Sequence, residues 1–81
     1  MKLPTTVRIR AAGMPSAITT VEGALAFIDR HLHSELAKLP RWTFARALLL
    51  EVMRTGKSRD MNAAVRQFKQ ALQNEKWLAD S

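Results

Sequence analysis

The stretch Ile18–Ile28, ITTVEGALAFI, marks the change from extended chain to helix in this sequence. Thr19 and Glu22 have the spacing of a capping box, in which the threonine hydroxyl accepts a hydrogen bond from the first helical turn and the glutamate reaches back to the cap. Apolar residues then recur at the spacing of one helix face, namely Val21, Ala24, Leu25, Ile28 and Leu32. The stretch predicts a helix over about residues 20–33, and its polar residues are interpreted as structural.

The segment before this stretch alternates in the manner of a half-buried strand. Val7 and Ile9 point to one side, whereas Arg8 and Arg10 fall on the other. A glycine and a proline follow and mark a turn, so we predict a β-hairpin over about residues 5–19. Because two strands alone are marginal in water, the hairpin must pack on helices. The two arginines are interpreted as charges that protect an exposed edge strand.

A second helix is predicted over about residues 42–55. Leu39-Pro40 prevents the first helix from running into it, because the residue before a proline avoids the helical conformation. Gly56 is a suitable residue for a left-handed C-cap. The expected core face of this helix consists of Ala45, Leu48, Leu49, Val52 and Met53.

A third helix is predicted over about residues 60–73, with Ser58 or Asp60 as its cap. Its expected buried face consists of Met61, Ala64, Val65, Phe68, Ala71 and Leu72. Taken together, these elements predict one small α+β domain over residues 1–81, with an N-terminal two-stranded β-hairpin packed on about three α-helices.

The composition agrees with a small globular domain held together by packing alone. The 81 residues are 47% hydrophobic and 25% charged, and none is a cysteine. Disulfides and cysteine nucleophiles are therefore excluded, which fits a reducing compartment. Apolar runs such as Ala47–Leu50 are too short to span a membrane. The charged N-terminus does not resemble a signal peptide, so we expect a cytoplasmic protein without a membrane partner.

The chain carries little that points to catalysis, a metal or a cofactor. It has no glycine-rich phosphate loop, no GxSxG motif, no cysteine and no tyrosine, so we predict that it is not an enzyme. His31, His33 and Glu35 form the one cluster that suggests a metal, but residues two apart on a helix face different directions, and a zinc site needs three or four ligands. We therefore predict neither a metal nor a cofactor.

The aromatic side chains admit two interpretations. Trp42, Phe44 and Trp77 could stack on nucleic-acid bases. A small core with few aromatic residues needs large apolar side chains to hold it, so we interpret all three as anchors of the fold.

The net charge of +6 is concentrated in the second half of the chain. Residues 41–69 hold seven basic and two acidic side chains, so five of the six excess charges lie there. Leu50 lies between Arg46 and Arg54 at four-residue spacings and should share their exposed face. A solvated helical surface is the simplest interpretation, but an apolar residue among arginines also suits a contact with a protein partner or a second copy of the chain. The predicted partner surface consists of Arg46, Leu50, Arg54, Lys57 and Arg59.

The preferred function is that of a small protein-interaction or accessory module, and the alternative is a small basic nucleic-acid-binding regulator that uses the second and third helices. Thr6–Arg10 is similar to the strand of a ribbon-helix-helix repressor. That strand runs almost directly into its first helix, whereas residues 11–40 intervene here. The nucleic-acid-binding alternative is therefore limited to a looser helix–turn–helix arrangement of the second and third helices.

Pro4 and Val7-Arg8-Ile9 in a strand, Ile18–Ile28 at a helix start and Gly56 at a later helix end follow one another in this chain. This order resembles the small bacterial family known as domain of unknown function 982. That family pairs a "PVxV" strand with a helix start of the form "I-T-S-V-E-E-A-L-x-F-L". Two positions depart from its pattern: Leu39-Pro40 stands where Trp-Pro is usual, and Val65 where an arginine is expected. The resemblance implies a compact α+β domain and no particular function. The residues that carry it are Pro4, Val7-Arg8-Ile9, Ile18–Ile28, Ala45, Ala47, Gly56, Ala64, Phe68, Ala71 and Trp77-Leu78.

Overall fold

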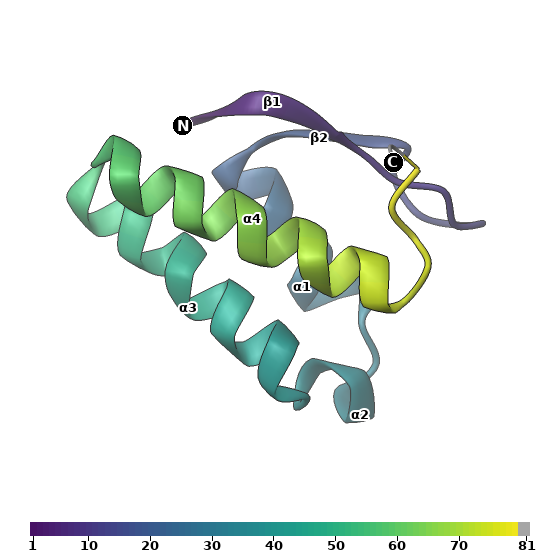
Figure 1. Cartoon of the computed structure of the whole chain (residues 1–81). Helices are drawn as coiled ribbons and strands as arrows, with labels where there is room; N and C mark the ends of the chain where they lie inside the picture. The colour runs from purple at the N-terminus through teal and green to yellow at the C-terminus, as the bar shows by residue number, and fades with distance from the viewer. Residues whose placement is uncertain (80–81) are drawn as a thin grey trace.

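The structure, a computed structural model, describes residues 1–79 and confirms the α+β class. The last two residues of the predicted 1–81 domain lie outside the described part. One single-turn helix was not predicted, so the fold consists of the hairpin and four helices (Figure 1). In chain order the elements are β1 (Lys2–Arg8), β2 (Ala17–Thr20), α1 (Val21–His31), α2 (Ser34–Ala37), α3 (Pro40–Thr55) and α4 (Ser58–Asn74).

The hairpin lies above the helices in the view of Figure 1. β1 packs on α4, β2 packs on α1, and α3 packs against both α1 and α4. The two strands are antiparallel, with Val7 opposite Ile18 and Lys2 opposite Thr20, and β1 contains extra residues between these two pairs. Pro4 lies in that irregular part, where a proline is tolerated because it has no N–H to donate to the ladder.

The edge of β1 that faces away from β2 is covered by the C-terminal segment. Ile9 forms a bridge with Leu78, and the Arg10 N–H donates to the Trp77 carbonyl over 2.7 Å. The Ala79 N–H donates to the Arg8 carbonyl over 3.0 Å. Backbone pairing therefore already covers this end of β1. The interpretation of Arg8 and Arg10 as charges that protect an exposed edge strand is wrong here. Their side chains remain exposed.

The start of α1 differs from the prediction by one residue. The Thr20 hydroxyl, not that of Thr19, accepts the capping hydrogen bond, from the Gly23 N–H over 2.9 Å. Glu22 consequently does not complete a capping box. Its carboxylate accepts from the Met1 amino group at 2.8 and 2.9 Å, and this contact holds the pKa of Glu22 below its ordinary value. β2 continues through Thr20, which is therefore the residue at the boundary with α1.

Four aromatic rings from four parts of the chain meet at the centre of the core. Phe27 of α1 lies 5.9 Å from Phe68 of α4 and 6.3 Å from both Trp42 of α3 and Trp77, measured between ring centroids. Trp42 is fully buried. The prediction that Trp42, Phe44 and Trp77 anchor the fold is confirmed for Trp42 and for Trp77, which is partly buried against the core. It is wrong for Phe44, which is 55% exposed.

Helix α3 begins two residues before its predicted start. Pro40 occupies its first turn, where the missing N–H costs nothing. Gly56 closes the helix in the left-handed conformation with φ +67°, as predicted, and its N–H donates to the Val52 carbonyl. Met53 was expected in the core and is 41% exposed. The fully buried face is narrower than predicted and consists of Trp42, Ala45, Leu49 and Val52.

Helix α4 begins at Ser58, and neither predicted cap is used. The N-cap residue is Lys57, which makes no side-chain cap. Asp60 instead accepts a hydrogen bond from the Thr55 hydroxyl over 2.6 Å, which links the first turn of α4 to the end of α3. Met61 is only partly buried, and the other predicted core residues are buried, namely Ala64, Val65, Phe68, Ala71 and Leu72.

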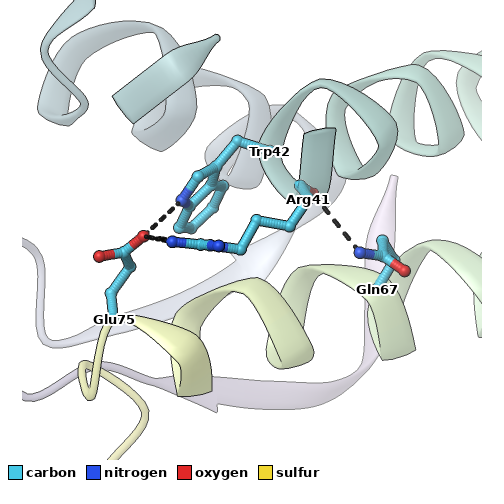
Figure 2. A network of polar contacts seen from close by, with 4 residues as sticks. All are labelled: Arg41, Trp42, Gln67 and Glu75. Carbon is cyan, nitrogen blue, oxygen red and sulfur yellow. Dashed lines mark hydrogen bonds and ion pairs between the residues drawn. The ribbon is translucent and has the colours of Figure 1, made fainter. Parts of the chain in front are cut away.

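A polar network joins the end of α4 to the start of α3 (Figure 2). One oxygen of Glu75 accepts from the Arg41 Nη2 at 3.0 Å, the Arg41 Nε at 3.3 Å and the Trp42 Nε1 at 3.2 Å. Gln67 donates to the Arg41 carbonyl. The indole N–H is the one polar group of the buried Trp42 ring, so Glu75 satisfies a donor that would otherwise be costly to bury.

Lys76 closes α4 in a conformation that favours glycine. Its φ is +62°, and the Trp77 N–H donates to the Leu72 carbonyl while the Lys76 N–H donates to the Gln73 carbonyl. This pair of bonds is the Schellman motif, whose left-handed residue is usually glycine.

We expect Lys76→Gly to raise the free energy of unfolding by about 0.5–1 kcal/mol, because relief of about 1–2 kcal/mol of left-handed strain exceeds the added entropy of the unfolded chain. Urea unfolding followed by circular dichroism measures it. The reverse change at the other left-handed C-cap, Gly56→Ala, has open space around the added methyl group and should lower the same quantity by about 1–2 kcal/mol. A neutral or destabilising Lys76→Gly would contradict this account of the helix end.

Candidate functional site

The five residues of the predicted partner surface are all exposed and follow one another along α3 and into α4. Arg46, Leu50 and Arg54 lie at four-residue spacings on one face of α3, as expected. Leu50 is 45% exposed. Lys57 and Arg59 follow at the turn into α4, so the surface has an apolar middle and a positive end.

The charges on α3 are more nearly balanced than the sequence suggested. Arg46 Nε lies 3.0 Å from the Asp29 Oδ1 of α1. Arg54 forms a two-point ion pair with Glu51, which raises the pKa of the guanidinium above its ordinary value. Because both pairs are exposed, water screens them and a partner can displace them at little cost.

An open groove of about 550 Å³ runs between α1, α2 and α3. Arg46 and Leu50 belong both to this groove and to the predicted surface. The groove is lined by Ile28, Asp29, Leu32, Ser34, Ala37, Thr43, Arg46, Ala47 and Leu50. Five of these nine residues are apolar, so the groove offers an apolar floor with an ion pair at its rim.

Most of the groove was missed at the level of sequence. Ile28 and Leu32 were predicted as core residues of the first helix, but nothing in their pattern showed that they also form the floor of a groove. Ala37 belongs to α2, a four-residue helix that was not predicted. A helix this short has no full apolar repeat that would predict it. The one available signal was the length of the segment between the end of α1 and Pro40, which leaves room for a helical turn.

The histidine cluster is dispersed in the structure. The ring of His31 packs on Phe27 with centroids 5.5 Å apart, while His33 and Glu35 are exposed at the start of α2. Within residues 1–79, no group of three or more histidine, aspartate or glutamate side chains is arranged to hold a metal ion. No helix in that part of the chain is long and apolar enough to cross a membrane.

These elements and their packing define the class of the protein, which is a small α+β domain with an open apolar groove between α1, α2 and α3. No protein-family model, curated protein or solved structure matches the chain. The resemblance to the domain of unknown function 982 family therefore stays a prediction.

Proposed function

We propose that this protein is a non-enzymatic interaction module that binds an amphipathic helix of an acidic partner protein in the groove between α1, α2 and α3. The observation that carries the proposal is the open apolar groove of about 550 Å³ with Leu50 exposed at its rim. A concave, largely apolar surface between helices suits the helix-in-groove mode of recognition, in which side chains spaced three or four residues apart enter the groove.

Charge favours an acidic partner over a second copy of the chain. The chain carries a net charge of +6, so two copies repel each other at long range. Beyond the groove, the surface ends at Lys57 and Arg59, which form no ion pair among the described residues. Acidic groups at one end of a bound helix would meet these two cations.

The polar groups of the groove support binding rather than catalysis. They comprise one carboxylate, one guanidinium and two hydroxyls, from Asp29, Arg46, Thr43 and Ser34. The carboxylate is bound to the guanidinium, so it is poorly suited to act as a general base. The proposal accordingly assigns the protein no reaction, in keeping with the family resemblance, which implies none.

An amide-shift titration with designed peptides tests the proposal. The probe is an amphipathic helical peptide of about four turns with leucines on one face and glutamates on the other, and the comparison peptide carries lysines in place of the glutamates. We expect the acidic peptide to shift amides of α1, α2 and α3 around the groove, and the basic peptide to bind more weakly. No shift with the acidic peptide, or shifts centred away from the groove, would overturn the proposal.

Leu50→Asp is the matching variant, and Phe44→Asp is its control. Phe44 is also an exposed apolar residue of α3, but it lies six positions before Leu50 and on a different face. We expect Leu50→Asp to weaken binding of the acidic peptide by at least about tenfold, because a buried leucine contributes about 1.5–3 kcal/mol. Equal effects of the two variants would contradict the groove as the site. If light scattering shows a dimer that Leu50→Asp abolishes, the occupant of the groove is a second copy of the chain and not an acidic partner.

A further inference from the structure

A second surface, separate from the groove, lies along the outward face of α4. Its exposed residues recur every three or four positions and so share one side of the helix, opposite the buried Phe68 and Leu72. With a rise of about 1.5 Å per residue, the stripe extends over about 21 Å. Its members are Arg59, Asn62, Arg66, Gln70 and Gln73, and the partly exposed Lys69 borders it.

This face carries cations that no described carboxylate neutralises, gathered in one row that contains no acidic residue. On α3, the side chains of Arg41, Arg46 and Arg54 are each paired with a carboxylate. In the part of the chain that the structure describes, Arg66 and Lys69 form no ion pair. The acidic residue within α4 itself is Asp60, which accepts from the Thr55 hydroxyl at the start of the helix.

We propose that the outward face of α4 binds the phosphate backbone of a double-stranded nucleic acid. Arginine and lysine are the principal donors to phosphate oxygens, and asparagine and glutamine amides add neutral donors. A row of such side chains on a rigid helix, without a carboxylate on the outward face, matches the regular negative charge of a duplex. This surface differs from the sequence-based alternative, which also placed arginines of the second helix at the contact.

The distribution of aromatic side chains favours a duplex over a single strand. Proteins that bind single strands stack bases on exposed aromatic rings. Among the described residues, Phe27, Trp42 and Phe68 are buried, Trp77 is partly buried against the first two of these, and the exposed Phe44 lies on α3. The outward face of α4 therefore offers donors for phosphates and no stacking platform.

The neighbours of α4 favour contact with the backbone over reading of base sequence. α3 packs along one side of the helix and β1 contacts it from the hairpin (Figure 1). An isolated helix fits the major groove, which is about 12 Å wide, but these flanking elements widen the surface that would have to enter. Binding should consequently be independent of sequence.

Fluorescence anisotropy with the full chain tests the proposal. The probes are a labelled DNA duplex of about two turns, an RNA duplex of the same length and the matching single strand. With about three phosphates neutralised, the logarithm of affinity should fall with the logarithm of salt concentration with a slope near −3, so a threefold rise in salt weakens duplex binding about 20-fold. No duplex binding near 50 mM salt, or tighter binding of the single strand, would overturn the proposal, as would a dependence on duplex sequence beyond about threefold.

Two double variants that remove the same charge locate the surface. Arg66→Gln with Lys69→Gln should weaken duplex binding at least about tenfold and reduce the salt slope by about 2. Arg8→Gln with Arg10→Gln removes the same two charges from the solvent side of the hairpin and should change affinity less than about threefold. Equal losses in both double variants would show that only net charge matters and would overturn the assignment to α4. Leu50→Asp should change duplex binding less than about threefold, because it alters net charge by one but lies off the α4 face, so this result is distinguishable from that of the groove.

Discussion

Trp42→Ala is expected to lower the free energy of unfolding by about 3–5 kcal/mol, the cost typical of deleting a large aromatic side chain from a packed core. Trp42 is fully buried, and its ring lies 6.3 Å from Phe27, 6.1 Å from Phe68 and 6.2 Å from Trp77 between centroids. Its loss would leave a cavity where α1, α3, α4 and the C-terminal segment meet. Since a chain of this length has a total stability of about 4–12 kcal/mol, the variant should be largely unfolded at modest urea concentrations.

Phe44→Ala is the matched control for this prediction. Phe44 is an aromatic residue of the same helix, two positions away, but it is 55% exposed. Its replacement should change the free energy of unfolding by less than about 1 kcal/mol. Urea unfolding followed by circular dichroism measures both variants. Similar losses in the two would show that the aromatic cluster does not concentrate the stability of the core.

Glu75→Ala is expected to lower the free energy of unfolding by about 2–3 kcal/mol, because it leaves the buried Trp42 N–H without its acceptor. The Glu75 side chain is 16% exposed and accepts from both Trp42 and Arg41. Glu75→Gln keeps an acceptor oxygen and should cost less than the alanine variant. A loss of indole N–H protection from hydrogen exchange in the alanine variant would identify Trp42 as the group affected.

Glu51→Ala provides the comparison for an ion pair at the surface. Glu51 binds Arg54, but both side chains are exposed. Its replacement should change the free energy of unfolding by less than about 1 kcal/mol, as is usual for exposed ion pairs. If Glu51→Ala costs as much as Glu75→Ala, the network at the end of α4 is no more important than a surface contact.

The two proposed binding surfaces share Arg59 and otherwise use different parts of the excess positive charge. The groove presents Leu50 beside ion pairs that a partner can rearrange, whereas α4 presents cations that no described carboxylate neutralises. A nucleic-acid duplex and an acidic helix are both polyanionic, so net charge alone attracts each of them. The exposed Leu50 favours the apolar side of an amphipathic helix, whereas the polar face around Arg66 favours the phosphates of a duplex.

Local features of this protein could be predicted from its sequence. Hydrophobic periodicity placed a hairpin before three helices and identified most of the buried residues, such as Val7, Ile28 and Phe68. Gly56 marked the end of a helix because its left-handed conformation favours glycine. These features depend on neighbours within a few positions, so spacing and residue type suffice to reveal them. The cap of α1 was displaced by one residue, since adjacent threonines are equivalent in such a pattern.

The tertiary structure decided the features that join distant parts of the chain. Asp29 of α1 neutralises Arg46 of α3, and Glu75 lies 33 residues from the indole it satisfies. The backbone of the C-terminal segment closes the edge of β1, and α2 completes a groove that no single helix contains. Each depends on how elements pack in three dimensions, which the spacing within one element does not encode. The sequence by itself therefore determined the kinds of elements and their buried faces, whereas the packing decided which charges are paired and where a partner can bind.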